Sequence, residues 1–90
     1  MWKEIAPGVR EIDLHGMDRA SARREVLEAL DSARRAGSKK LRIIHGKGTG
    51  ILREEVRFLL EEHPAVADFK YALPRHGGDG ATEVLLRRGR

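Results

Sequence analysis

Cysteine is absent from this 90-residue chain, aromatic residues make up only 4% of it, and proline occurs three times. The absence of cysteine excludes a disulfide framework and a zinc site with cysteine ligands. No segment approaches the roughly 20 apolar residues of a membrane-spanning helix, and no signal-peptide pattern opens the sequence. We therefore expect a cytoplasmic protein without a membrane partner, built as one small domain with a modest core.

Charge is abundant where aromatics are scarce. Lysine and arginine together number 18 and aspartate and glutamate 14, which gives a net charge of +4. Because arginine outnumbers lysine and binds phosphate through two parallel hydrogen bonds, a polyanion is the first partner to consider. A solvated, charge-rich surface of the kind found in heat-stable proteins is the alternative explanation. With so few aromatics, stacking on single-stranded bases is not an obvious binding mode.

Hydrophobic periodicity predicts the order strand, helix, strand, helix, strand, strand. The strands are expected at residues 9–15, 41–44, 66–73 and 81–87, and the helices at residues 19–36 and 51–62. Asp18 is the expected N-cap of the first helix and Gly37 the glycine that follows it, whereas Pro64 ends the second helix. Residues 1–8 show no period and are interpreted as an N-terminal arm, and residues 89–90 as a frayed C-terminus.

This order of elements predicts an α/β fold, a two-layer βαβαββ sandwich. The two helical crossovers call for parallel neighbouring strands and right-handed connections. The final two strands form a hairpin, so the last strand should be antiparallel in a four-stranded mixed sheet. Two helices can cover only one face of such a sheet, which leaves the other face partly open.

The loop at residues 45–50, with the sequence HGKGTG, lies between a short apolar strand and an amphipathic helix. Glycine permits a positive φ and a close approach of the backbone to a ligand, and we expect Gly48 to need this freedom. Free N–H groups at the start of a helix, together with Lys47, favour an anion such as phosphate. A tight turn without a ligand is the alternative. A Walker loop is excluded because the lysine comes too early in the motif.

Asp13 and His15 lie on the polar face of the first strand, about 6.5–7 Å apart along it. Because the carboxyl ends of parallel strands meet at one edge of a sheet, both residues should lie close to residues 45–50. Such a group suits phosphodiester cleavage: His15 moves a proton, Asp13 orients the imidazole or holds a water or a metal, and Lys47 stabilises negative charge. In the alternative reading Asp13 pairs with an arginine and His15 caps the strand or the neighbouring helix.

The other histidines give weaker signals. His45 has the same strand parity as the apolar Leu41 and Ile43, so a structural histidine bonded to backbone is the alternative to a role in proton transfer. His63 reads as a helix end, and His76 lies in the loop of the final hairpin. No pair of histidines has the spacing of a metal site, and no metal ligand is assigned.

Three segments, residues 12–16 (IDLHG), 45–50 (HGKGTG) and 77–82 (GGDGAT), resemble in order and spacing the three motifs of the Smr (small MutS-related) domain. The likeness extends over about residues 9–87. It is greatest to the C-terminal domain of the bacterial MutS paralogue that suppresses homologous recombination. The resemblance implies a fold similar to the C-terminal domain of translation initiation factor three, with a nuclease domain at residues 9–88. Residues 1–8 would then be a linker remnant from a longer MutS-like chain.

The resemblance further implies a structure-directed endonuclease, a hydrolase that binds and nicks branched or double-stranded DNA. Some family members cleave messenger RNA on stalled ribosomes, so DNA is the first expected partner and RNA or the ribosome the second. The candidate catalytic residues are Asp13, His15 and Lys47. The candidate nucleic-acid-binding residues are His45, Gly46, Gly48, Thr49, Gly50, Arg42, Arg53, Gly78 and Gly80. No cofactor is assigned, and a requirement for a divalent metal, Mg²⁺ or Mn²⁺, stays open.

Two other functions remain in competition with the nuclease. A non-catalytic module that recognises branched nucleic acid or ribosomal RNA would use the same basic edge. Asp13 favours the nuclease, because a pure phosphate binder gains nothing from a carboxylate at that position. A binder of small nucleotides would need a closed pocket, and a two-layer sheet of this size offers only a shallow cleft.

Overall fold

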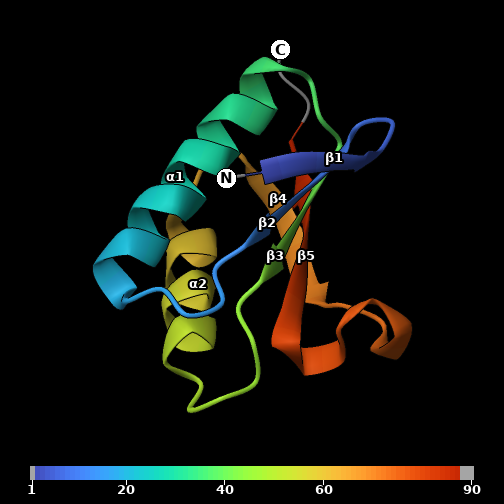
Figure 1. Ribbon diagram of the computed structural model, residues 1–90. Helices are drawn as coiled ribbons and strands as arrows, with labels where there is room; N and C mark the ends of the chain where they lie inside the picture. Colours follow the sequence, from blue (N-terminus) through green and yellow to red (C-terminus); the bar gives the residue numbers. More distant parts are fainter. Residues whose placement is uncertain (1, 88–90) are drawn as a thin grey trace.

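The computed structural model describes residues 2–87, and in it two helices cover one face of a five-stranded sheet (Figure 1). The strands are β1 (Trp2–Ala6), β2 (Val9–Asp13), β3 (Lys40–Ile44), β4 (Val66–Tyr71) and β5 (Ala81–Leu86). The helices are α1 (Arg19–Arg35) and α2 (Ile51–Glu62), and two short 3₁₀ turns, η1 (Pro74–His76) and η2 (Gly78–Gly80), precede β5. The predicted two-layer α/β fold is confirmed. The predicted frayed end at residues 89–90 lies outside the described residues.

The predicted count of four strands was wrong by one, because most of the supposed arm is the edge strand β1. This strand pairs antiparallel with β2 after a turn in which Gly8 has a φ of 76°. All five residues of β1 are exposed, so the strand has no buried face and leaves no period-two pattern in the sequence. Trp2 packs on the domain through Arg10, whose guanidinium lies 3.5 Å from the centre of the indole ring.

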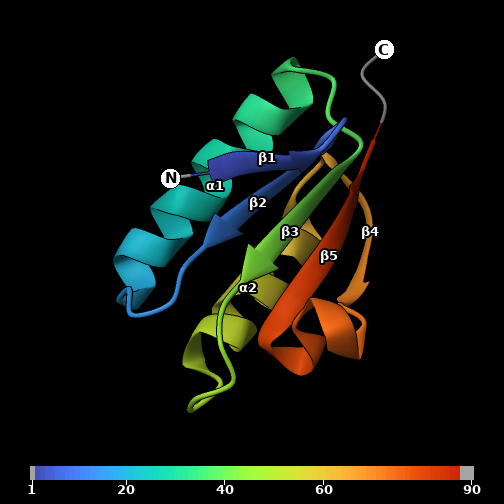
Figure 2. The same cartoon turned by 45° about the vertical axis from the view of Figure 1, so that its right-hand side comes forward.

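The order of strands across the sheet is β1-β2-β3-β5-β4 (Figure 2). As predicted, β2 and β3 are parallel neighbours and β5 is antiparallel. The expected pairing of β3 with β4 is not formed, because β5 lies between them and pairs antiparallel with both. The two strands still run in the same direction, so α2 crosses over β5 to connect them.

The two helices begin where the sequence predicts. The Oδ1 atom of Asp18 caps α1 by accepting the N–H of Ser21 at 2.8 Å, and Gly37, with a φ of 74°, follows the end of the helix. Helix α2 has the predicted bounds, and its N-cap is Gly50, with a φ of 86°. In the described part of the chain, neither helix is long and apolar enough to cross a membrane.

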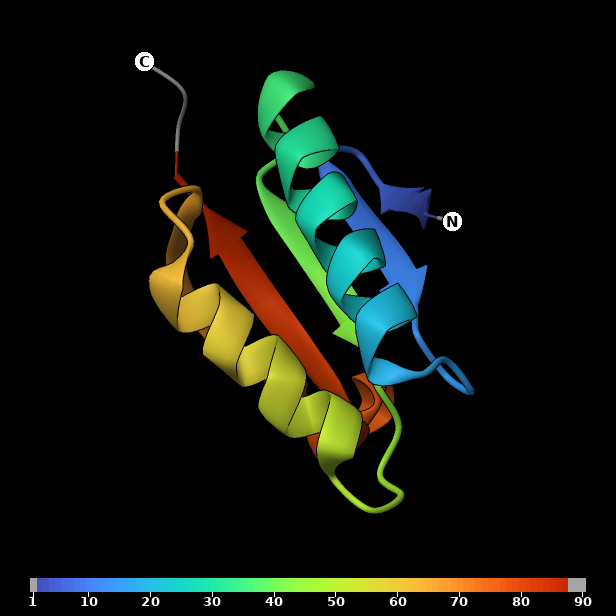
Figure 3. The same ribbon diagram turned by 90° about the vertical axis from the view of Figure 1, so that its left-hand side faces the viewer.

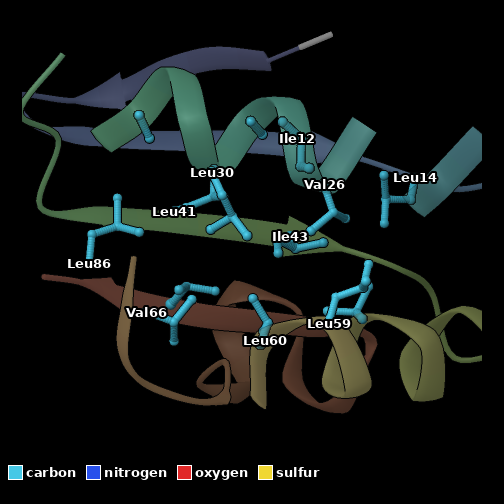
Figure 4. Close-up of a cluster of buried hydrophobic side chains, with 14 of the residues drawn as sticks. Ile12, Leu14, Val26, Leu30, Leu41, Ile43, Leu59, Leu60, Val66 and Leu86 are labelled. Atoms are coloured by element: carbon cyan, nitrogen blue, oxygen red, sulfur yellow. The ribbon is translucent and has the colours of Figure 1, made fainter. Parts of the chain in front are cut away.

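The core fills the space between the helices and the sheet (Figure 4). Its buried strand residues alternate with exposed ones, and its helix residues recur every three or four positions. The largest fully buried side chains are Ile12, Leu14, Val26, Leu30, Leu41, Ile43, Val56, Leu60 and Val84. Packing of both helices on these strand residues holds the ends of β2 and β3 in a fixed position.

The face of the sheet that points away from the helices carries a row of paired charges. Arg42, in the middle of β3, lies 3.5 Å from Glu11 of β2 and 2.8 Å from Glu83 of β5. Its side chain is only 17% exposed. Lys3 of β1 extends the row, at 3.9 Å from Glu11. Arg42 therefore lies on the open face with both neighbouring acids bound to it, and not at the glycine loop where its predicted role would place it.

Candidate nucleic-acid interface

The turn after β2, the loop after β3 and the 3₁₀ turn η2 gather at one end of the sheet (Figure 3). The parallel strands β2 and β3 both finish there, as predicted, and the antiparallel β5 begins there. The N–H groups of His45 and Gly46 both donate to the carbonyl oxygen of Gly80, at 3.0 and 2.9 Å. The three sequence motifs therefore form one continuous surface.

The glycine loop turns at its first and last glycines. Gly46 and Gly50 have positive φ values of 80° and 86°. The expectation for Gly48 was wrong, because its φ is not positive and no atom lies within 4 Å of the place where a Cβ would be. Among the residues that the structure describes, the amide groups of Lys47, Gly48 and Thr49 have no backbone acceptor, as expected of an anion site at the start of a helix.

A groove separates this loop from the start of α1, and His15, Lys47, Thr49 and Arg53 are part of its lining. The imidazole of His15 lies beside the loop, since its Cδ2 atom is 3.8 Å from the position of a Cβ built on Gly46. His15 and Lys47 are both exposed, so the groove presents an imidazole and an ammonium to solvent. The structure thus places these two candidate catalytic side chains next to the unpaired loop amides.

Asp13 lies at the end of β2, exposed on the open face of the sheet, and does not line that groove. Its Oδ1 atom accepts the backbone N–H of His15 at 2.9 Å. Within residues 2–87 the carboxylate has no ion pair with an arginine and no hydrogen bond with the imidazole of His15. Asp13 therefore holds the turn that carries His15, while its Oδ2 atom is available to solvent. In the same residues no three His, Asp or Glu side chains could hold a metal ion by themselves.

An acid of the third motif, which is not among the predicted site residues, lies among the cations of this surface. The Oδ1 atom of Asp79 is 3.7 Å from Nζ of Lys47, and its Oδ2 atom is 4.0 Å from Nη1 of Arg53. Of this motif, only Gly78 and Gly80 were predicted to bind nucleic acid. Exposed ion pairs contribute only about 0–1 kcal/mol, so a phosphate can displace the carboxylate at little cost.

The third motif also contacts the loop through Gly80. A Cβ built on Gly80 would lie 3.1 Å from Cγ of Lys47, so the absence of a side chain there lets the lysine stem pack closely. Gly78 has a φ of 57° and turns the chain within η2. Of the two, only Gly80 lies against Lys47.

His45 connects the loop to β5. The side chain is 5% exposed, with Nε2 at 2.8 Å from Oγ1 of Thr82 and Nδ1 at 3.1 Å from the carbonyl oxygen of Gly46. A neutral ring satisfies both contacts, because Nδ1–H donates to Gly46 while Nε2 accepts the hydroxyl of Thr82. Burial lowers the pKa of His45, although the backbone hydrogen bond to Gly46 acts in the opposite direction. This geometry fits a structural histidine that is bonded to backbone, which was the alternative to a role in proton transfer.

We expect the free energy of unfolding to fall as the pH drops below the ordinary histidine pKa of 6.5. The folded state keeps His45 neutral at a pH where the unfolded chain already binds a proton, so acid favours unfolding. Burial lowers the pKa of His63 too, which adds to the effect in the same direction. Urea unfolding at pH 7.5 and pH 5.5 measures the difference. His45→Asn and His63→Asn should each reduce it, and an undiminished difference in His45→Asn would contradict the assignment.

Comparison with known proteins agrees with this arrangement. The family model described as the Smr domain matches residues 12–87. Endonuclease MutS2 of Carboxydothermus hydrogenoformans is 48% identical over 77 residues, which cover 86% of this chain and 10% of that protein. Endonuclease MutS2 of Thermus thermophilus is 47% identical over 79 residues, which cover 88% and 11%. The chain therefore spans about a tenth of the length of these curated relatives.

Two solved structures have the same fold. The crystal structure of the Smr domain of Thermus thermophilus MutS2 has a TM-score of 0.84 at 47% identity, covering 86% of this chain and 96% of that one. YdaL, a stand-alone small MutS-related protein from Escherichia coli, has a TM-score of 0.83 at 33% identity, covering 87% and 64%. The resemblance carried by the three motifs is confirmed, and the chain belongs to the Smr domain family.

Proposed function

We propose that this chain is an endonuclease domain that binds nucleic acid and nicks a phosphodiester bond at the end of the sheet where its three motifs meet. The observation that carries the proposal is the groove in which the exposed His15 and Lys47 lie beside the unpaired amides of the glycine loop. The relatives named Endonuclease MutS2 support a nuclease over other uses of such a groove.

In this proposal the glycine loop holds the phosphate that is to be cleaved. The unpaired amides of residues 47–49 and the N-terminus of α2 attract negative charge, and Lys47 adds a full positive charge. Arg53 is within reach because it lines the same groove. These groups stabilise the charge that accumulates on the phosphate oxygens in the transition state.

Water attacks the phosphorus atom while the P–O bond to the leaving oxygen breaks. The exposed imidazole of His15 donates a proton to that oxygen, and the free Oδ2 atom of Asp13 accepts a proton from the attacking water. Were a divalent metal bound, Asp13 would be a ligand to it and the metal would make that water more acidic. Asp13 lies on the outer side of the turn that follows β2, and His15 lies on its groove side. The nucleic-acid strand that is cut must therefore lie across this turn. An open edge of this kind suits the backbone of a duplex or branched DNA first, and RNA second.

Lys47→Ala should weaken DNA binding roughly tenfold and reduce the slope of log K against log salt concentration by about one. Lys3→Ala is the matched control, because Lys3 is similarly exposed (74% against 71%) and similarly paired with an acid (3.9 Å against 3.7 Å) but lies on the far edge strand. Fluorescence anisotropy with labelled linear and four-way-junction DNA at several salt concentrations gives both quantities. Equal losses in the two variants would place the DNA elsewhere.

Nicking itself is measured on supercoiled plasmid and on four-way-junction DNA, with Mg²⁺, with Mn²⁺ and with EDTA. Wild-type chain should convert supercoiled plasmid to the open circular form, and Lys47→Ala should do so more slowly than Lys3→Ala. If wild-type chain binds both DNAs but cuts neither under any of these conditions, the domain is a binding module and the proposed chemistry is wrong.

A further inference from the structure

A second groove, of about 300 Å³, lies between α2 and the edge strand β4. Its lining consists of Arg53 and Arg57 from α2, Phe69, Lys70 and Tyr71 from β4, and Thr82 from β5. Arg53 and Arg57 are four positions apart, so they project from the same side of the helix. Because Arg53 also lines the groove at the glycine loop, the two grooves share a wall.

The ring of Tyr71 is available in this second groove. Tyr71 is paired with Thr82 in the sheet register and so lies on the helix side of β4, yet it is 49% exposed. Phe69, two residues earlier on the same face, is partly buried against the core and supports the strand beneath the groove. The groove therefore contains the exposed ring of Tyr71, and packing of Phe69 on the core fixes the position of β4, which carries that ring.

Two arginines of α2 lie beside that ring. Within residues 2–87 no acid lines the groove, and Lys70, which also borders it, pairs with Glu83 in the sheet register and so points to the open face of the sheet. Arg53 and Arg57 have only surface partners, Asp79 at 4.0 Å and Glu61 at 3.4 Å. A basic groove with an exposed aromatic ring is the arrangement that binds single-stranded nucleic acid by stacking and phosphate contacts.

A third groove, between the first turns of α1 and α2, has an exposed aromatic ring but no excess of positive charge. Phe58 of α2 is 58% exposed there, but the groove is lined by the acids Glu54 and Glu55 as well as by two arginines. Glu55 already binds both arginines, at 3.5 and 3.3 Å. The charges around Phe58 cancel, so a polyanion is drawn to the Tyr71 side.

We propose that the groove between α2 and β4 binds an unpaired base of the nucleic-acid strand whose neighbouring phosphate lies on the glycine loop. The base stacks on Tyr71, and Arg53 and Arg57 hold the phosphates on either side of it. A base in a continuous duplex stays in its own stack and leaves the groove empty. The inference rests on the proposed function, and it makes an unpaired nucleotide next to the bound phosphate, as at a branch or a flap, the preferred substrate.

The single tyrosine of the chain gives a direct test. Chain labelled with 3-fluorotyrosine has one ¹⁹F resonance, which is followed during titration with a six-nucleotide thymidine strand, the corresponding uridine strand, and an abasic strand of the same length. Stacking should shift the resonance with the base-bearing strands and not with the abasic one. Equal shifts with all three strands would mean that the groove takes only backbone, which would overturn the inference.

Variants separate this site from the glycine loop. Tyr71→Ala should weaken binding of flap DNA about tenfold and leave binding of continuous duplex unchanged, whereas Tyr71→Phe and the control Phe58→Ala should retain both. Circular dichroism verifies that each variant is folded. If Lys47→Ala weakens flap binding and Tyr71→Ala does not, the stacking site is wrong and the proposed function stands. If wild-type chain binds none of the oligonucleotides, both proposals fall.

Discussion

Replacing Asp13 with asparagine should slow nicking by about 10²- to 10³-fold and leave the affinity for DNA nearly unchanged. The side-chain oxygen of asparagine can still accept the N–H of His15, so the turn keeps its geometry. What the substitution removes is the negative charge that accepts a proton or holds a metal. Initial rates of plasmid nicking, compared with anisotropy on the same preparations, separate the loss of chemistry from a loss of binding.

Asp68→Asn is the matched control for that experiment. Asp68 is an exposed acid on β4 whose Oδ1 atom also accepts a backbone N–H, that of Phe69, at 2.9 Å. The substitution therefore makes the same chemical change on the edge strand β4, away from the turn that carries His15, and should leave nicking unaffected. If Asp13→Asn nicks DNA at the wild-type rate, Asp13 only shapes the turn before His15 and takes no part in catalysis.

Gly50→Ala should lower the free energy of unfolding by about 1–2 kcal/mol, because alanine resists the left-handed backbone that Gly50 adopts with a φ of 86°. The new Cβ would also lie 2.8 Å from Nη2 of Arg53, so the guanidinium must move. Since Arg53 lines both grooves, we expect weaker DNA binding in addition to the loss of stability. Urea unfolding measures the first effect and anisotropy the second.

Gly48→Ala makes the same change two residues earlier and should cost less than about 0.5 kcal/mol. Gly48 has no positive φ and no neighbouring atom within 4 Å of a built Cβ. The pair of variants therefore tests the backbone conformation of the loop and not its composition. Similar losses of stability at both positions would contradict the conformation described for this loop.

The sequence predicts the helices well and the edges of the sheet poorly. Asp18 and Gly37 are local signals that fix the ends of α1 whatever it packs against, and the glycine loop and Pro64 bracket α2 in the same way. Strand β1 has no buried face, so nothing in its sequence marks it. The position of β5 between β3 and β4 depends on contacts between distant segments, which no local pattern encodes.

At the candidate site, too, local patterns were predictable and contacts between distant segments were not. Asp13 and His15 could be placed near the glycine loop because parallel strands finish at a common edge. Arg42 was misplaced because its acidic partners, Glu11 and Glu83, lie on neighbouring strands whose register the sequence does not give. The groove beside Tyr71 was missed for a related reason, since it exists only where α2 passes the edge of the sheet.

Strand β5, the last strand of the described residues, determines when the candidate site can assemble during synthesis. Until β5 leaves the ribosome, β3 and β4 have no common partner, and the loop amides of His45 and Gly46 lack the Gly80 carbonyl that they share. Domains of this size fold only when such distant contacts can close. A nascent or truncated chain that ends before Ala81 therefore carries every candidate catalytic residue and still lacks the assembled candidate site.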